Sequence, residues 1–139
     1  MPKKNIAPSN PSPAKMNKLR TLIVEDNNHF RQTLRESLQV SFPQMDIDEA
    51  VNGAEALEKV NAFLPDLILM DLRLPGESGL GLTERIKAIY PDVTIFILTN
   101  YDTLECREAA SRCGADRFIT KDSLNRARLE ELIKSYFKI

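Results

Sequence analysis

Five short apolar segments alternate with amphipathic ones from Arg20 onward, and this alternation constrains the fold more than any other feature. The apolar segments have the length of β-strands and read RTLIVE, MDIDEA, DLILMD, TIFILT and RFIT. The segments that follow them carry apolar residues at helical spacing, which predicts four inward faces: Phe30, Leu34 and Leu38; Leu57, Val60 and Leu64; Leu82, Ile86 and Ile89; Leu129, Leu132, Ile133 and Tyr136. Strands that alternate with helices in this way predict an α/β fold, in which helices cover both faces of a parallel sheet.

The length and the charge distribution predict one folded domain with a tail before it. A chain of 139 residues has room for one ordinary domain, which we place at residues 19–139. Residues 1–18 hold four lysines, four prolines and no acid, which is typical of a disordered basic tail. The remainder has 15 basic and 20 acidic residues, which argues against direct binding of nucleic acid by the domain.

Hydropathy and cysteine content exclude two further classes of protein. No apolar run approaches 18 residues and no leader pattern is present, so we expect a cytoplasmic protein that makes no membrane contact. Cys106 and Cys113 are seven residues apart in a segment that looks helical, which separates them by roughly 10.5 Å and precludes a disulfide. We expect both to pack in the core, because no Cys/His cluster suggests a metal site.

Polar side chains stand where the predicted strands end. Glu25 and Asp26 follow the first strand, Asp71 ends the third, Thr99 ends the fourth, and Lys121 follows the fifth. Any one of them could be an ordinary strand-terminal residue or a helix cap. In an open parallel sheet, however, the carboxyl ends of the strands form the ligand-binding edge, so we expect all five to converge there.

Three carboxylates at one edge predict a cation site. Acids held about 4–6 Å apart repel one another and raise each other's pKa unless a cation enters. Oxygen ligands without Cys or His favour a hard ion, which we expect to be Mg²⁺, with Mn²⁺ as the second choice. A metal ion and a lysine on either side of one carboxylate are suited to a phosphoryl group, whose transfer depends on positioning and charge neutralisation.

The segments LIVEDN, DLILMDLRLPGESG, FILTNYD and GADRFITKDS, in this order and spacing, resemble the receiver domain of two-component response regulators. The resemblance covers residues 19–139. It implies a flavodoxin-like (βα)5 fold, a doubly wound five-stranded parallel sheet with strand order 2-1-3-4-5. It also implies phosphorelay signalling by a protein that is not an enzyme, apart from assisting its own phosphorylation and dephosphorylation.

The resemblance assigns a role to each residue at the sheet edge. Asp71 matches the aspartate that accepts a phosphoryl group, and Thr99 and Lys121 match the hydroxyl and the lysine that act on that group. The metal ligands implied are the side chains of Glu25, Asp26 and Asp71 and the backbone carbonyl of Arg73.

A conformational switch and several partners are implied as well. Phe118 stands where the family has an aromatic residue that changes rotamer together with the switch threonine, Thr99. The face formed by the fourth helix, the fifth strand and the fifth helix is expected to respond to phosphorylation. The implied partners are a sensor histidine kinase or a phosphotransfer protein and, as a candidate, a second copy of the chain in a phosphorylation-dependent homodimer.

Arg73 and Tyr101 are predicted to control how long the phosphoryl group survives. In this fold they are the two side chains best placed beside the path of a water that attacks phosphorus opposite Asp71. One is a long cation and the other a broad ring, and neither would orient that water. We therefore expect slow self-dephosphorylation; the alternative is that both are simply exposed loop residues.

Three other classes of protein were compared with this sequence. A dehalogenase-type phosphatase would have a D-x-D motif after the first strand, where this chain has Glu25, Asp26 and Asn27. A flavodoxin would have a Ser/Thr-rich phosphate loop there. The third alternative is the N-terminal receiver part of a helix-turn-helix transcriptional regulator, whose output domain would be absent because the last predicted helix extends to the end of the given sequence.

Overall fold

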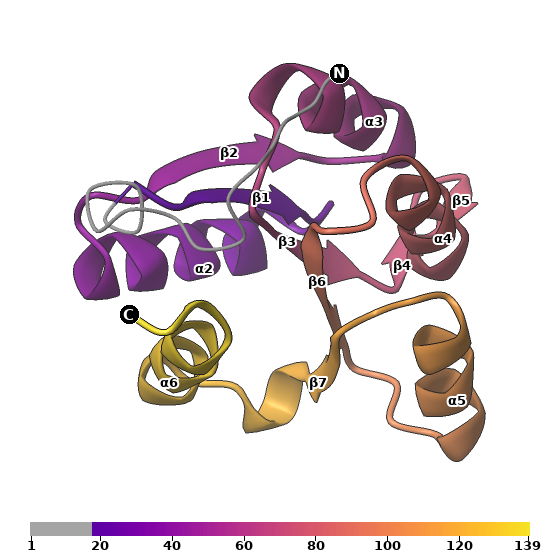
Figure 1. Ribbon diagram of the computed structural model, residues 1–139. Helices are drawn as coiled ribbons and strands as arrows, with labels where there is room; N and C mark the ends of the chain where they lie inside the picture. The colour runs from indigo at the N-terminus through magenta and orange to yellow at the C-terminus, as the bar shows by residue number, and fades with distance from the viewer. Residues whose placement is uncertain (1–17) are drawn as a thin grey trace.

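The structure is a computed structural model that describes residues 18–139, and its centre is one parallel sheet (Figure 1). The strands of this sheet are β1 (Arg20–Val24), β2 (Asp46–Ala50), β3 (Leu67–Asp71), β6 (Thr94–Thr99) and β7 (Arg117–Thr120). Their order across the sheet is β2-β1-β3-β6-β7, which equals the predicted order 2-1-3-4-5 when only these strands are counted. The flavodoxin-like fold predicted from the sequence is confirmed.

Each α-helix of the described chain begins after a side chain that caps it. The helices are α2 (Asn28–Ser41), α3 (Gly53–Phe63), α4 (Gly79–Ile89), α5 (Leu104–Arg112) and α6 (Arg126–Phe137), with a 3-10 turn, η1 (Lys121–Ser123), before α6. A side-chain oxygen of each capping residue accepts a hydrogen bond from a backbone N–H of the first turn; the caps are Asn27, Asn52, Ser78, Thr103 and Asn125. Such caps stabilise a helix start by about 1 kcal/mol and explain why the helices begin where they do.

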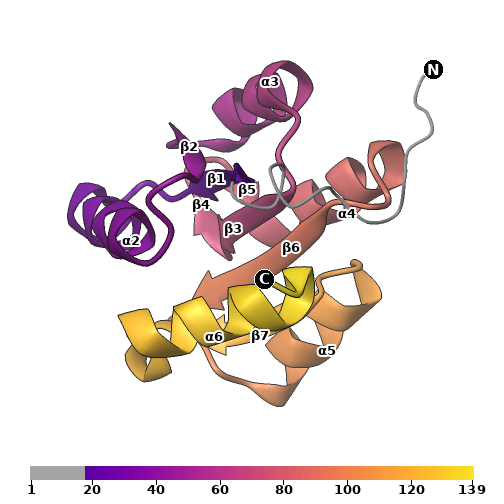
Figure 2. The same ribbon diagram turned by 60° about the vertical axis from the view of Figure 1, so that its left-hand side comes forward.

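The helices cover the two faces of the sheet in separate groups, α2 and α6 on one face and α3, α4 and α5 on the other (Figures 1 and 2). Side chains of alternate strand positions point to opposite faces. In β3, Leu67 and Leu69 accordingly pack under α2 and α6, whereas Ile68 and Met70 pack under α3 and α4. The central strand is therefore buried on both sides, and its last residue, Asp71, lies at the rim of the core.

The predicted inward faces of the helices are correct in their centres and wrong at some of their ends. Leu34, Leu38, Val60, Leu82, Ile86, Leu129, Leu132 and Ile133 are buried as predicted. Leu64 is 51% exposed and Ile89 is 63% exposed. Leu64 caps α3 in the left-handed conformation (φ 51°) and Ile89 is the last residue of α4, so neither continues the inward face of its helix. Tyr136 is 38% exposed: its ring packs edge-on against Phe96, while its hydroxyl donates to the carbonyl of Asp116.

Two further details correct or complete the sequence analysis. Helix α5 ends at Arg112, so Cys113 caps the helix rather than lying within it. Both cysteines are free and partly buried, and Cys106 packs against the core as expected. The segment after β3 forms a short hairpin of β4 (Arg73–Leu74) and β5 (Glu77–Ser78), which the sequence did not indicate.

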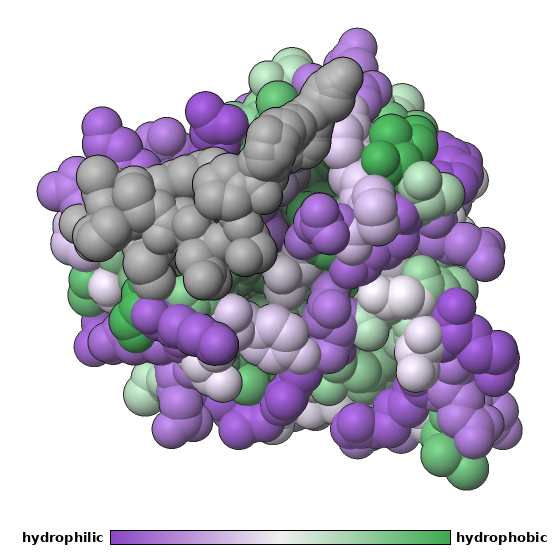
Figure 3. All heavy atoms as spheres, in the orientation of Figure 1, coloured by the Kyte–Doolittle hydropathy of each residue, from purple (hydrophilic) through white to green (hydrophobic). Residues whose placement is uncertain are grey.

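On the face that Figure 3 shows, the residues not drawn in grey are largely hydrophilic, with hydrophobic residues in separate spots. No helix among residues 18–139 is long and apolar enough to cross a membrane. The predicted tail at residues 1–18 falls, except for Lys18, outside the described residues and stays a prediction, as does the domain boundary at residue 19.

Candidate functional site

The carboxyl ends of the central strands bring the predicted side chains together. Glu25 follows β1, Asp71 ends β3, Thr99 ends β6, and Lys121 follows β7. From β1 the chain crosses to β2 on one side, and from β2 it returns to β3 on the other side. The winding therefore reverses between β1 and β3, which is where open parallel sheets bind their ligands.

Glu25, Asp26 and Asp71 form an acidic cluster at this reversal point. One carboxylate oxygen of each lies within 4.8 Å of the others. Glu25 is 2% exposed and Asp71 is 8% exposed, whereas Asp26 is open to solvent. The cluster thus has two acids in the protein rim and one at the surface, through which a cation could enter.

Lys121 is the cation that the structure places against these acids. Its Nζ lies 2.8 Å from Glu25 Oε1 and 3.6 Å from Asp71 Oδ1. The same nitrogen lies 4.4 Å from the ring centroid of Phe30 on α2, an attractive cation–π contact. The lysine is shared between two carboxylates, so it neutralises only part of their charge.

The environment of Asp71 makes its ionised form costly. The pKa of Asp71 rises from 3.8 to about 6, chiefly because burial disfavours the charged carboxylate. The negative charge of Glu25 adds to the rise in this pKa, while Lys121 opposes it. A buried acid with a raised pKa beside another acid is typical of a functional site, and a bound cation would relieve the repulsion.

The two predicted switch residues occupy different depths. Thr99 is 1% exposed, and its hydroxyl accepts a hydrogen bond of 3.0 Å from the backbone N–H of Tyr101. Phe118 lies in β7, half-buried against the core on the α3–α5 face. The guanidinium of Arg107 on α5 lies over the Phe118 ring at 4.9 Å and also pairs with Asp102.

Arg73 and Tyr101 contact each other although 28 residues separate them in the sequence. The guanidinium carbon of Arg73 lies 4.0 Å from the centroid of the Tyr101 ring. Both side chains are exposed; Arg73 begins β4 in the hairpin after β3, and Tyr101 lies in the loop after the neighbouring strand, β6. The structure therefore joins the two residues into a stacked pair beside the rim of the site.

Sequence reasoning missed two residues of α2 that touch the site, Phe30 and Arg31. Phe30 was assigned only to the helix core, and Arg31 received no role. One signal for Arg31 was available: it lies near the positive end of the α2 dipole, where a cation is unfavourable unless another partner binds it. Besides Asn28 on its own helix, its partners come from the turn after β1 and from β2, and no local pattern in the sequence reveals those two.

Residues 21–134 match the family model described as the response regulator receiver domain. The chain belongs to this family. It is 37% identical over 100 residues to the chemotaxis protein CheY of Halobacterium salinarum, covering 72% of this chain and 82% of that protein. It is 33% identical to the response regulator MprA of Mycobacterium ulcerans, covering 83% of this chain but only 47% of that protein.

Solved receiver structures have the same fold as this receiver domain. The signal receiver domain of a DNA-binding response regulator from Colwellia psychrerythraea superimposes with a TM-score of 0.82 at 27% identity, covering 88% of this chain and all of that one. Receiver domains are generally non-enzymatic phosphoacceptors that bind Mg²⁺ at an acidic pocket and interact with histidine kinases or phosphotransfer proteins. The acidic cluster of this receiver has the all-oxygen ligand set that such an ion requires.

Proposed function

We propose that Asp71 accepts the phosphoryl group that a sensor histidine kinase or a phosphotransfer protein delivers to this receiver. One observation carries the proposal: the buried carboxylate at the end of β3 lies within 4.8 Å of two other acids and 3.6 Å from Lys121. A nucleophile between a cation site and a fixed ammonium group is the arrangement that phosphoryl transfer needs.

The reaction begins with an attack of an Asp71 oxygen on phosphorus. The bond between phosphorus and the imidazole nitrogen of the donor breaks, and the imidazole keeps the electron pair and takes up a proton. Asp71 must be ionised to attack, and with a pKa of about 6 most of it is ionised at neutral pH. Lys121 and the hydroxyl of Thr99 then stand ready to contact the oxygens of the transferred group.

Glu25, Asp26, Asp71 and the backbone carbonyl of Arg73 would hold the Mg²⁺ ion. When bound, the ion supplies positive charge between the anionic nucleophile and the anionic phosphoryl group. Both oxygens of Glu25 are already engaged, one by Lys121 and the other by the backbone N–H of Asn27 at 3.1 Å. We infer that Lys121 can leave Glu25 and contact the phosphoryl group once a bound cation balances the negative charge of Glu25.

A phosphorylation assay of the wild-type protein and of Asp26→Ala tests the proposal. With a histidine kinase or acetyl phosphate as donor, we expect intact mass spectrometry to show one added phosphoryl group in Mg²⁺ and none in EDTA. Asp26→Ala should lose both Mg²⁺ binding and phosphorylation, because Asp26 is the exposed ligand through which the ion enters. Phosphorylation of this variant at the wild-type rate would show that the acidic pair has been misinterpreted.

We propose that the Arg73–Tyr101 pair slows loss of the phosphoryl group by covering the path of the attacking water. The stack at 4.0 Å supports this proposal. Arg73→Ala and Tyr101→Ala should each shorten the lifetime severalfold, and the double variant should resemble the single ones because either change opens the pair. The measurement is the decay of phosphorylated protein in Mg²⁺ after the kinase is removed. Ile89→Ala, at an exposed position on α4, is the control. Equal decay in all variants would refute the proposal that the pair covers the water path.

We further propose that Thr99 and Phe118 transmit phosphorylation to the face formed by α5, β7 and α6. A hydrogen bond from Thr99 to a charged phosphoryl oxygen contributes about 1.5–3 kcal/mol. A nearly complete population switch needs about 5.5 kcal/mol. We infer that a second contribution, such as homodimer formation or target binding on this face, completes the switch.

The relatives support two contexts for the receiver. Coverage of 82% of a CheY protein supports a receiver that acts alone, whereas coverage of 47% of MprA supports one that is joined to an output domain. The similar receiver structure from Colwellia psychrerythraea is likewise part of a DNA-binding response regulator, which supports the second context. The codon that follows Ile139 in the gene decides between the two contexts.

The cytoplasmic location expected from the sequence stays a prediction.

A further inference from the structure

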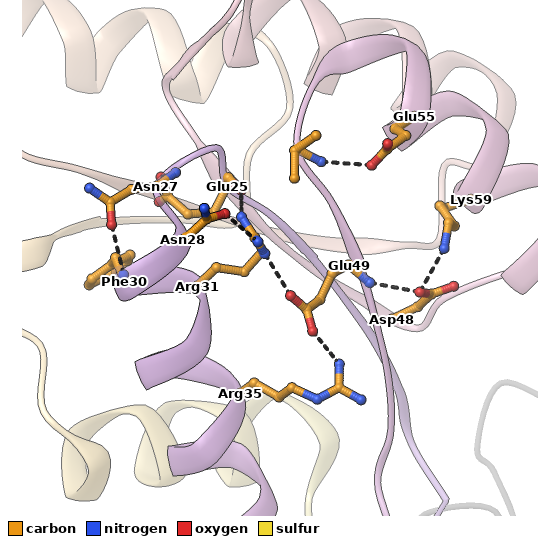
Figure 4. A network of polar contacts seen from close by, with 11 residues as sticks. Glu25, Asn27, Asn28, Phe30, Arg31, Arg35, Asp48, Glu49, Glu55 and Lys59 are labelled. Carbon is orange, nitrogen blue, oxygen red and sulfur yellow. Dashed lines mark hydrogen bonds and ion pairs between the residues drawn. The ribbon is translucent and has the colours of Figure 1, made fainter.

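Arg31 connects the turn that carries the acidic pair to the neighbouring strand (Figure 4). Its Nη1 donates to the backbone carbonyl of Glu25 at 2.9 Å, and its Nη2 donates to the side-chain oxygen of Asn28 at 2.6 Å. Its Nε donates to Glu49 Oε1 at 2.6 Å. All three types of guanidinium nitrogen are therefore used, each on a different partner.

The geometry points to Arg31 as a positioning residue for the cation site: held by Glu49, it sets the orientation of the peptide that joins Glu25 to Asp26. This inference rests on the proposed function, because it concerns the same acidic cluster. Arg31 contacts no carboxylate of that cluster by any hydrogen bond or ion pair within the described residues. It would act through the main chain.

The planarity of the peptide explains why one hydrogen bond has this effect. The carbonyl of Glu25 and the N–H of Asp26 belong to a single rigid plane. A donor fixed on that carbonyl therefore limits the rotation of the backbone on both sides, from which the two acidic side chains extend. The backbone N–H of Glu25 is held separately, by the carbonyl of Ala50 at 3.0 Å.

Helix geometry brings Arg31 to this position, and β2 keeps it there. Side chains on a helix point toward its N-terminus, so Arg31 covers the turn that precedes α2. Glu49 lies in β2 opposite Ile23 of β1, which anchors the guanidinium to the sheet. The side chain of Arg31 is only 15% exposed, and its contacts with Glu25 and Glu49 are partly buried, so they hold it more firmly than a fully exposed pair would.

Arg35 offers a matched control within the same network. It lies one turn further along α2 and binds the other oxygen of Glu49 at 2.5 Å, but has no hydrogen bond to the turn after β1. Loss of Arg35 therefore removes a cation and a Glu49 contact but leaves the hydrogen bond from Arg31 to the Glu25 carbonyl in place. Loss of Arg31 removes a cation, a Glu49 contact and this hydrogen bond as well (Figure 4).

Positioning and electrostatics predict opposite signs for Arg31→Ala. Removing a cation beside three acids would by itself strengthen Mg²⁺ binding. Removing the hydrogen bond that orients the Glu25–Asp26 peptide should weaken Mg²⁺ binding, and loss of groups that orient metal ligands typically lowers metal affinity about 10–100-fold. We expect about tenfold weaker Mg²⁺ binding for Arg31→Ala, at the low end of this range because Arg31 acts through the main chain and not on the ligand side chains. Arg31→Lys should also bind more weakly, because one ammonium cannot reach three separate acceptors.

The experiment is a Mg²⁺ titration of each full-length variant, followed by amide NMR shifts, with hydrogen exchange of residues 25–28 measured in EDTA. We expect weaker Mg²⁺ binding and faster exchange in Arg31→Ala and Arg31→Lys, and wild-type values in Arg35→Ala. Unchanged or tighter binding in both Arg31 variants would overturn the inference, as would equal weakening in Arg35→Ala. If Arg31→Ala does not fold, Arg31→Lys alone decides. Absence of Mg²⁺ binding in the wild type would instead refute the proposed function. The exchange rates of residues 25–28 would still test whether Arg31 holds the backbone of this turn.

Discussion

Asp71→Asn is expected to abolish phosphorylation of this receiver completely. The amide has nearly the shape of the carboxylate but no anionic oxygen to attack phosphorus. Among the described residues, Glu25 is the only other acid paired with Lys121, and both of its oxygens already accept hydrogen bonds, from Lys121 and from the backbone N–H of Asn27. The measurement is intact mass after incubation with phosphodonor and Mg²⁺. Asp122→Asn, at an exposed carboxylate next to Lys121, is the control and should be phosphorylated like the wild type. A phosphoryl group that persists in Asp71→Asn would show that another residue is the acceptor.

The same variant should be more stable than the wild type in the absence of metal, and this result would show that its inactivity is not due to unfolding. Because the pKa of Asp71 is raised in the folded state, its contribution to stability is complete below pH 3.8 and is lost as the pH rises through about 6. At pH 7 the ionised group, buried and beside the negative charge of Glu25, opposes folding by on the order of 2–3 kcal/mol even with Lys121 nearby.

Urea unfolding in EDTA measures this difference. We expect Asp71→Asn to raise the free energy of unfolding at pH 7 by about 2 kcal/mol and to gain less at pH 4. The gain should shrink when Mg²⁺ is added, since the ion relieves the repulsion only in the wild type. A variant less stable than the wild type at pH 7 in EDTA would contradict the raised pKa.

Gly79→Ala should have the second large effect, on the backbone that holds Asp71. A Cβ atom at Gly79, the first residue of α4, would lie 2.0 Å from the backbone oxygen of Asp71 and 3.1 Å from Cα of Leu72. Neither neighbour is a flexible side chain, so the end of β3 or the start of α4 must move. We expect a loss of about 3 kcal/mol in the free energy of unfolding and a slower phosphorylation reaction.

Gly81→Ala, two residues further in the same helix, is the matched control. A Cβ at Gly81 meets nothing within 4 Å, and alanine stabilises a helix interior by about 0.5–1 kcal/mol relative to glycine. The two substitutions add the same methyl group to α4 and should change stability in opposite directions. Equal changes in the free energy of unfolding, measured in urea, would mean that the close approach of Gly79 to the backbone of Asp71 does not constrain the end of β3.

Local periodicity predicted the elements well, because each depends on residues close in the sequence. The run DLILMD is apolar on both alternating faces, which is typical of a strand covered by helices on both sides, and β3 is buried throughout. Periodicity failed at Leu64 and Ile89, where the apolar pattern continues but the helix ends. It also gave no indication of the β4–β5 hairpin, whose strands have two residues each.

The sequence by itself determined the fold class, the strand order through its resemblance to receivers, and which polar residues stand at the strand ends. Only the tertiary structure decided how those residues pair. Lys121 meets Glu25 across 96 positions, Arg73 stacks on Tyr101, and Glu49 holds Arg31. The physical reason is the range of the interactions: strand and helix patterns repeat every two to four residues, whereas these contacts form between side chains that approach only when the parallel strands align.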